Sequence, residues 1–200
     1  ENQIIEKAQY LFFKYGLKSV TMDELARELG ISKKTLYGSF SNKQELINII
    51  TIRLIEQHER DCKEIIDNAD DAIQEVLINV NNLKSIFQKF NQKVIYEMKK
   101  YYSESWEIFK NYKNEFLSER IKNNLNRGIE EGLYRKNINA DIAVKLRIEQ
   151  MQIVSNLTLF PSINFNRKEV SKELFLQILY GMSTIKGHEL INHYLEINKE

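Results

Sequence analysis

The sequence has little of the residues that interrupt helices or cross-link chains: among 200 residues there are one proline, seven glycines and one cysteine. Proline and glycine are what turn-rich β-sandwiches and barrels require, so their scarcity excludes an all-β architecture. The single cysteine, Cys62, cannot form a disulfide within the chain. The sequence contains neither an apolar run near the roughly 18 residues of a membrane span nor a leader-like start. We therefore expect a soluble, cytoplasmic protein that makes no membrane contact.

An excess of charge of one sign is also missing. The chain carries 29 basic and 28 acidic residues, for a formal net charge of +1, and 42% of its residues are hydrophobic. This composition excludes a disordered chain and a uniformly basic one. Any contact with nucleic acid must therefore come from a local cluster of charge.

Helical periodicity runs through most of the chain. Apolar residues recur at spacings of three and four, and capping residues separate the periodic segments. We expect an all-α fold of about nine helices, with a compact N-terminal three-helix head over residues 1–45 and a C-terminal helical bundle over residues 46–200. The expected helices cover residues 3–15, 22–29, 33–39, 42–66, 71–90, 93–101, 104–131, 140–159 and 167–196.

Two of the expected helices are short and lie on either side of a tight turn. Thr21 and Glu24 form a capping box for the first, Gly30 ends it, and Ser32 caps the second. Two short helices across a glycine turn are typical of a helix-turn-helix whose second helix enters the DNA major groove. The sequence therefore predicts a helix-turn-helix within the head.

Local positive charge coincides with the second of these helices. The segment from Ile31 to Lys43 contains Lys33, Lys34 and Lys43 and no acidic residue. Such a cluster is the electrostatic footprint of a DNA contact. On charge alone, a solvated basic helix on a small bundle explains it equally well.

The residues themselves favour the DNA interpretation. Between Ile4 and Leu46 the chain reads LFFKYG, then VTMDELARELGISKKTLYGSF, then SNKQEL. These segments resemble the DNA-binding head of the tetracycline-repressor (TetR) family of bacterial transcription factors. Farther on, RGIEEGLYR at residues 127–135 resembles a helix ending frequent in that family.

The resemblance implies a homodimeric, ligand-responsive regulator that acts as a repressor and is released from a palindromic operator by a small apolar effector. It assigns residues 1–45 to DNA binding and residues 46–200 to ligand binding and dimerisation. Gly38 departs from the family, which often carries a larger side chain there, so base reading is expected to shift to its neighbours. The DNA-binding residues it implies are Thr21, Ser32, Lys33, Lys34, Thr35, Tyr37, Ser39 and Lys43.

Aromatic residues gather in the middle of the chain. Nine of the 21 lie in the thirty residues from Phe87 to Phe116. A bundle core accounts for most of them, yet a cluster rich in tyrosine and tryptophan also lines apolar pockets with a few polar groups. If part of the cluster is such a pocket, the effector is apolar or aromatic. The candidate ligand-binding residues are Tyr96, Trp106, Phe109, Tyr112, Phe116 and Met151.

The last two long helices, 140–159 and 167–196, are apolar on more than one stripe. Such a pattern indicates burial on two sides. A four-helix interface between two copies of the chain fits this pattern and the family resemblance. Deeper burial within one chain is the alternative.

Patterns that would indicate an enzyme or a bound metal are incomplete. In HELINH, His188 and His193 are five residues apart and point about 140° away from each other on a helix, so they do not share a metal-binding face. We expect no cofactor, no metal and no enzymatic activity. Two alternatives remain: a helical enzyme or small-molecule carrier that keeps the head only as structure, and a non-specific architectural DNA binder.

Overall fold

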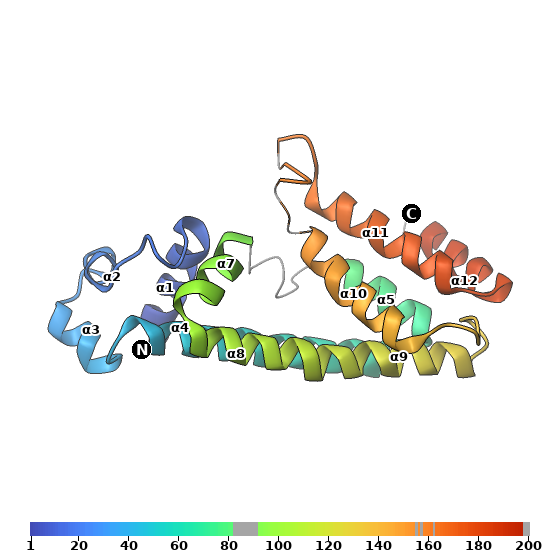
Figure 1. Ribbon diagram of the computed structural model, residues 1–200, viewed down its shortest axis with the longest axis horizontal. Coiled ribbons are helices and arrows are strands. Elements are labelled where there is room, and N and C mark those ends of the chain that lie inside the picture. The colour runs from blue at the N-terminus through green and yellow to red at the C-terminus, as the bar shows by residue number, and fades with distance from the viewer. Residues whose placement is uncertain (82–91, 155, 157, 162, 198–200) are drawn as a thin grey trace. The chain divides into compact units, whose positions relative to one another are not determined.

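The computed structural model describes residues 1–81, 92–154, 156, 158–161 and 163–197. Over these residues the protein is all-α, and its only strand-like pairing is an isolated bridge between Tyr134 and Ser183 (Figure 1). None of the helices described is long and apolar enough to cross a membrane. The helices are α1 (Asn2–Tyr15), α2 (Met22–Leu29), α3 (Lys33–Ser39), α4 (Lys43–Asn68), α5 (Ala72–Asn81), α7 (Gln92–Tyr101), α8 (Ser103–Tyr112), the π-helical turn η1 (Lys113–Leu117), α9 (Ser118–Glu130), α10 (Ala140–Val154), α11 (Arg167–Met182) and α12 (Ile185–Ile197).

Contacts between the helices divide the chain into two units. The first contains residues 1–58 and 92–112 of the described chain, and the second contains residues 59–81 and 113–197. Helix α4 contributes residues to both units without a break. The expected division near residue 45 separates a DNA-binding function from a ligand-binding one and stays a prediction.

The first three helices form a head around a small apolar core. Phe12 of α1, Leu25 of α2 and Leu36 of α3 are at most 1% exposed. Helix α2 begins at the capping box of Thr21 and Glu24, both halves of which are present, and it ends at Gly30 in the left-handed conformation. The boundaries of α2 and α3 are those that the capping residues predict.

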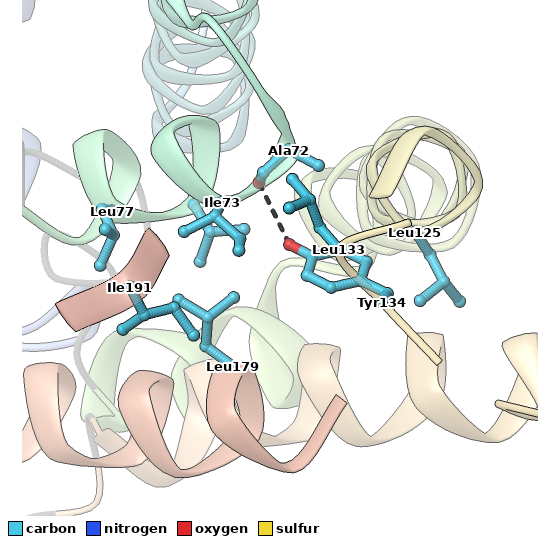
Figure 2. Packing of buried hydrophobic residues seen from close by; sticks show 9 residues of the cluster. Ala72, Ile73, Leu77, Leu125, Leu133, Tyr134, Leu179 and Ile191 are labelled. Atoms are coloured by element: carbon cyan, nitrogen blue, oxygen red, sulfur yellow. Dashed lines mark hydrogen bonds between the residues drawn. The ribbon is translucent and has the colours of Figure 1, made fainter. Parts of the chain in front are cut away.

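In the second unit, the core surrounds one buried tyrosine. Tyr134 follows α9, is 1% exposed, and donates a hydrogen bond from its hydroxyl to the carbonyl oxygen of Ala72 at the start of α5 (Figure 2). Leu179 of α11 and Ile191 of α12 belong to the same cluster. Segments far apart in the sequence therefore share this core.

Two of the expected helices differ from those found. The range 140–159 is helical only to Val154, and residues 158–160 form a turn and bend. The range 167–196 is two helices, α11 and α12, because the chain at Ser183 and Thr184 leaves the helix to pair with another segment. The N–H of Thr184 donates to the carbonyl oxygen of Leu133, and the N–H of Arg135 donates to that of Met182, each at 2.9 Å.

Two further expected helices, and the start of the aromatic cluster, agree with the structure only in part or lie partly outside the described residues. The range 104–131 is helical as expected but contains the π-helical turn η1. Of the range 71–90, the structure describes Ala72–Asn81 as helix. Phe87 and Phe90, which open the aromatic cluster, lie outside the described residues.

Close packing of Tyr134 against Gly128 yields a stability prediction. A Cβ atom on Gly128 would lie 2.1 Å from the Tyr134 ring, which is buried and has no room to move. We expect Gly128→Ala to lower the free energy of unfolding by about 1–3 kcal/mol, as overpacking of a core does. Chemical denaturation monitored by circular dichroism measures the change.

The control is Gly181→Ala in α11, where an added Cβ meets nothing within 4 Å. Alanine in a helix interior should there stabilise the protein by up to about 1 kcal/mol. Equal effects of the two substitutions would contradict the packing described around Tyr134.

Candidate nucleic-acid interface

Helix α3 presents a basic, polar face to solvent. Leu36 is fully buried against the head core. At about 100° per residue, Lys34 and Gly38 lie directly opposite Leu36, with Thr35 and Tyr37 beside them. All four are exposed. The side chains available at the centre of this face are therefore those of Lys34, Thr35 and Tyr37, because Gly38 contributes none.

Lys33 lies at the edge of that face and is already paired. Its ammonium is 2.5 Å from the carboxylate of Asp23, which is in the first turn of α2, and both side chains are more than half exposed. An exposed pair of this kind contributes at most about 1 kcal/mol. Lys33 can therefore exchange Asp23 for a phosphate at small cost, whereas Lys34 has no such competitor among the described residues.

Thr21 and Ser32 act first as helix caps. The Thr21 hydroxyl oxygen accepts the N–H of Glu24, and that of Ser32 accepts the N–H of Thr35 at 3.0 Å. Hydrogen bonds from the backbone and side chain of Thr21 lower the pKa of Glu24, so the capping carboxylate stays ionised. Both residues are exposed. The caps hold the start of α2 and of α3 in the orientation that the helix-turn-helix needs.

The two remaining candidates are less exposed. Ser39 is partly buried, and its hydroxyl is 3.4 Å from the carbonyl oxygen of Thr35. Lys43 places its ammonium 5.5 Å from the centre of the Phe12 ring and 5.6 Å from that of Tyr102. Partial burial lowers the pKa of Lys43, and the charges of Glu97 and Glu24 oppose that change. A phosphate contact by Lys43 stays a prediction.

The turn between α1 and α2 is clamped by α7. The Glu97 carboxylate, on α7 and 7% exposed, accepts the N–H of Lys18 at 2.9 Å. Lys93 donates to the carbonyl oxygen of Tyr15 at 2.6 Å. Gly16 lies between these groups with a φ of +99°, and a Cβ there would be within 3 Å of both Lys93 and Glu97. Through these contacts α7 fixes the helix that precedes the helix-turn-helix.

The sequence pattern did not reveal Asp23 or Glu97 as functional neighbours. Asp23 is ten residues from Lys33, on the other side of the turn, and an acidic residue in a first helical turn is usually explained by the helix dipole. Glu97 is 79 residues from Lys18. Neither pairing leaves a local signal in one sequence.

The candidate ligand-binding residues are divided between the two units. Tyr96 (58% exposed), Trp106, Phe109 and Tyr112 belong to the first unit, and Phe116 and Met151 belong to the second. Along α8, the ring centres of Trp106 and Phe109 are 6.1 Å apart, and those of Phe109 and Tyr112 are 6.4 Å apart. Phe109 and Tyr112 are buried, while Trp106, Phe116 and Met151 are partly exposed.

Comparison with known proteins identifies relatives of the head and of the whole chain. Residues 4–50 match the family described as bacterial regulatory proteins, tetR family. Over 89 residues the chain is 29% identical to the uncharacterized HTH-type transcriptional regulator YvaF of Bacillus subtilis, a match that covers 44% of this chain and 47%, about half, of YvaF. Over 193 residues it is 22% identical to the HTH-type transcriptional repressor KstR2 of Mycobacterium tuberculosis, covering 92% of this chain and 93% of KstR2.

Solved structures show that the fold is shared along most of the chain. The ketosteroid transcriptional regulator KstR2 of Mycobacterium tuberculosis superposes with a TM-score of 0.68 at 18% identity, covering 92% of this chain and 94% of that one. A transcriptional regulator from Saccharomonospora viridis, in complex with choline, gives a TM-score of 0.79 at 15% identity, covering 92% and 97%. At these identities the likeness concerns the fold.

The geometry of α3 predicts opposite effects for two neighbouring charges. Lys34→Gln should weaken binding to double-stranded DNA about tenfold, because an exposed cation opposite Leu36 is lost. The slope of the logarithm of the binding constant against the logarithm of the salt concentration should fall by about one, since about one counterion fewer is released. Asp23→Asn should tighten binding about two- to fivefold, because it frees Lys33 and removes a negative charge. Fluorescence anisotropy over a series of salt concentrations measures both, on a DNA fragment selected by the wild-type protein.

Lys122→Gln is the matched control, since Lys122 is an exposed lysine on α9 in the second unit. It should leave affinity unchanged. If Lys34→Gln behaves like Lys122→Gln, α3 does not face DNA in the manner described.

Proposed function

We propose that the chain is a DNA-binding transcriptional regulator of the tetR family, whose model matches residues 4–50, and that it acts as a homodimeric repressor that leaves a palindromic operator when a small effector binds. The observation that carries the proposal is the agreement between the family match over residues 4–50 and the exposed basic face of α3 within them. The DNA contacts we propose are those of Lys33, Lys34, Thr35 and Tyr37, with Thr21, Ser32, Ser39 and Lys43 beside them.

Selection from random-sequence DNA tests this function directly. A two-fold symmetric dimer should select an inverted repeat whose half-sites are recognised by identical α3 helices. Footprinting of the selected fragment should then protect both half-sites at a salt concentration where unrelated DNA is released. Recovery of random sequence with no protected site would instead indicate a non-specific architectural binder.

A helical enzyme or carrier that keeps the head only as structure is the less favoured alternative. Such a protein would have no need for an unpaired exposed cation at the centre of α3. Its head would tolerate loss of Lys34 with no effect on its activity. The relatives over the whole chain and over the head are transcriptional regulators.

An exposed apolar stripe on α10 supports the proposed dimer. Ile142, Leu146 and Ile153 are 57%, 58% and 37% exposed. On a helix these three positions fall within about 40° of one another. The opposite side of α10 is buried in the second unit, where Val144 and Ile148 are less than 10% exposed. The two-sided apolar pattern of α10 is thus explained by one face inside the chain and one face outside it.

We propose that this outer face of α10 packs against α10 and α11 of a second copy. An obligate interface between identical chains commonly buries about 2,000 Å² or more, and a closed two-fold dimer uses the same patch on both chains. A dimer also explains how two α3 helices are presented to the two halves of a palindromic operator.

Replacing Leu146 by a charged residue tests the interface. We expect Leu146→Glu to convert a dimer of twice 23.8 kDa into a monomer at micromolar concentration, because two glutamates would be brought into an apolar contact. Light scattering coupled to size-exclusion chromatography measures the mass. Lys122→Glu, which adds the same residue to α9 away from this stripe, should leave the dimer intact. A monomeric wild-type protein would remove the interface from the proposal.

The effector is proposed to bind in the helical body. In the second unit the candidate contacts are Phe116 and the thioether of Met151, which are partly exposed. In the first unit the candidates are Tyr96, Trp106, Phe109 and Tyr112. The Phe109 side chain is 2% exposed, so it contributes mainly to packing. Binding releases DNA only if the effector has a higher affinity for the arrangement of the protein that does not bind the operator.

A further inference from the structure

A charged side chain lies inside the second unit with most of its hydrogen-bonding capacity unused. Arg147, on the inner side of α10, is 7% exposed. Its Nε and Nη1 atoms are buried and have no hydrogen-bond partner among the described residues. Each buried, unpaired donor of a charged group is costly, so an arginine in this state needs a reason.

The contacts that the structure describes around Arg147 do not satisfy its buried N–H donors. Its guanidinium carbon lies 4.6 Å from the centre of the Phe175 ring, a cation–π contact that uses the face of the group and none of its N–H donors. Burial lowers the pKa of Arg147, while Tyr134 and Glu75 act electrostatically in the opposite direction. Arginine remains protonated in proteins, so the positive charge persists.

The carboxylate that acts electrostatically on Arg147 already has two other partners. Glu75 of α5 is buried. Its Oε1 atom accepts a hydrogen bond from Nη2 of Arg120 at 3.0 Å, and its Oε2 atom lies 3.6 Å from Nη1 of Arg127. Arg127 is further paired with Glu131 at 2.7 Å. The Nε atom of Arg120 is, like two of the Arg147 nitrogens, buried and without a hydrogen-bond partner. Both carboxylate oxygens of Glu75 are therefore already engaged by Arg120 and Arg127.

A second copy of the chain cannot supply the missing acceptor. Arg147 is buried within a single chain and lies about 100° around α10 from Leu146 of the exposed stripe. No described residue supplies its missing acceptor, so an acceptor from solution would have to enter the second unit. A planar, bidentate set of N–H donors is suited to a carboxylate or a phosphate.

Resting on the proposed effector response, we propose that Arg147 binds the anionic group of the effector, and that the effector is an apolar molecule carrying one carboxylate or phosphate. Met151 is one turn beyond Arg147 on the same inner side of α10. The apolar part of the effector follows Met151.

Matched ligands separate the charge from the apolar part. Fatty acids of 8 to 16 carbons, the corresponding alkyl phosphates and the corresponding alcohols are titrated into the full-length protein by calorimetry and by thermal shift. We expect at least one anionic series to raise the melting temperature, because it binds the folded protein, and to bind at least tenfold more tightly than the alcohols. The better anion distinguishes a carboxylate from a phosphate. If neither anion binds more tightly than the alcohol, the proposal is overturned.

Substitution of Arg147 identifies the residue responsible. Arg147→Met should reduce anion affinity at least tenfold, leave alcohol affinity unchanged, and raise the melting temperature of the ligand-free protein, because a buried unpaired charge is replaced by an apolar chain. Arg147→Lys keeps the charge without the bidentate donors and should retain intermediate affinity. Lys122→Met, at an exposed lysine of the same unit, should change none of these.

The outcomes distinguish this proposal from the function on which it rests. Ligand-free Arg147→Met should bind selected DNA as the wild type does, and anions should no longer release it. Release of Arg147→Met by anions at wild-type concentrations would refute the role of Arg147 while leaving the repressor function intact. Failure of the wild-type protein to bind any selected DNA would refute the proposed function. The anion titration would still decide whether Arg147 binds an anion. A lower melting temperature for ligand-free Arg147→Met would show that the arginine is structural.

Discussion

The second unit depends on Tyr134. Its ring fills the space that the missing side chain of Gly128 leaves, its hydroxyl donates to the carbonyl oxygen of Ala72, and its backbone pairs with Ser183. Burial raises the pKa of that hydroxyl far above its ordinary value, so it remains a neutral donor. One residue thus joins α5, the end of α9, and the junction of α11 and α12. Without the Tyr134 side chain, α5 and the segment after α9 would lose the hydrogen bond and the buried contacts that join them.

The pairing of Tyr134 with Ser183 also explains which helix boundary could not be predicted from the sequence. Capping residues are local, and they placed the boundaries of α2 and α3 correctly at Thr21 and Ser32. The break at Ser183 is not local, because it arises from pairing with a segment some fifty residues earlier. The apolar pattern continues through it, so periodicity alone predicts one helix where the structure has two.

The candidate sites differ in the same way, because one could be predicted from local sequence and the other could not. The exposure of Lys34 and Tyr37 could be predicted, because a short helix with Leu36 on one side must turn its other side to solvent. Arg147 could not, because an arginine in an amphipathic helix usually extends into water. The pattern of α10 indicated burial on two sides but gave no sign that a charge would be inside. Only the packing of α10 against its neighbours reveals it.

Charge therefore serves two different purposes at the two ends of α4. In the head it is exposed, screened by salt and exchangeable, as the pair of Lys33 and Asp23 illustrates. In the second unit it is buried and shielded from salt, so a change in its partners has a larger energetic effect. Cys62 of α4 interacts with Arg120, and burial raises the pKa of its thiol to about 11, so it remains a neutral neighbour of that charge. Helix α4 itself runs without a break from Lys43 in the first unit to Asn68 in the second, so the two settings of charge lie along one helix.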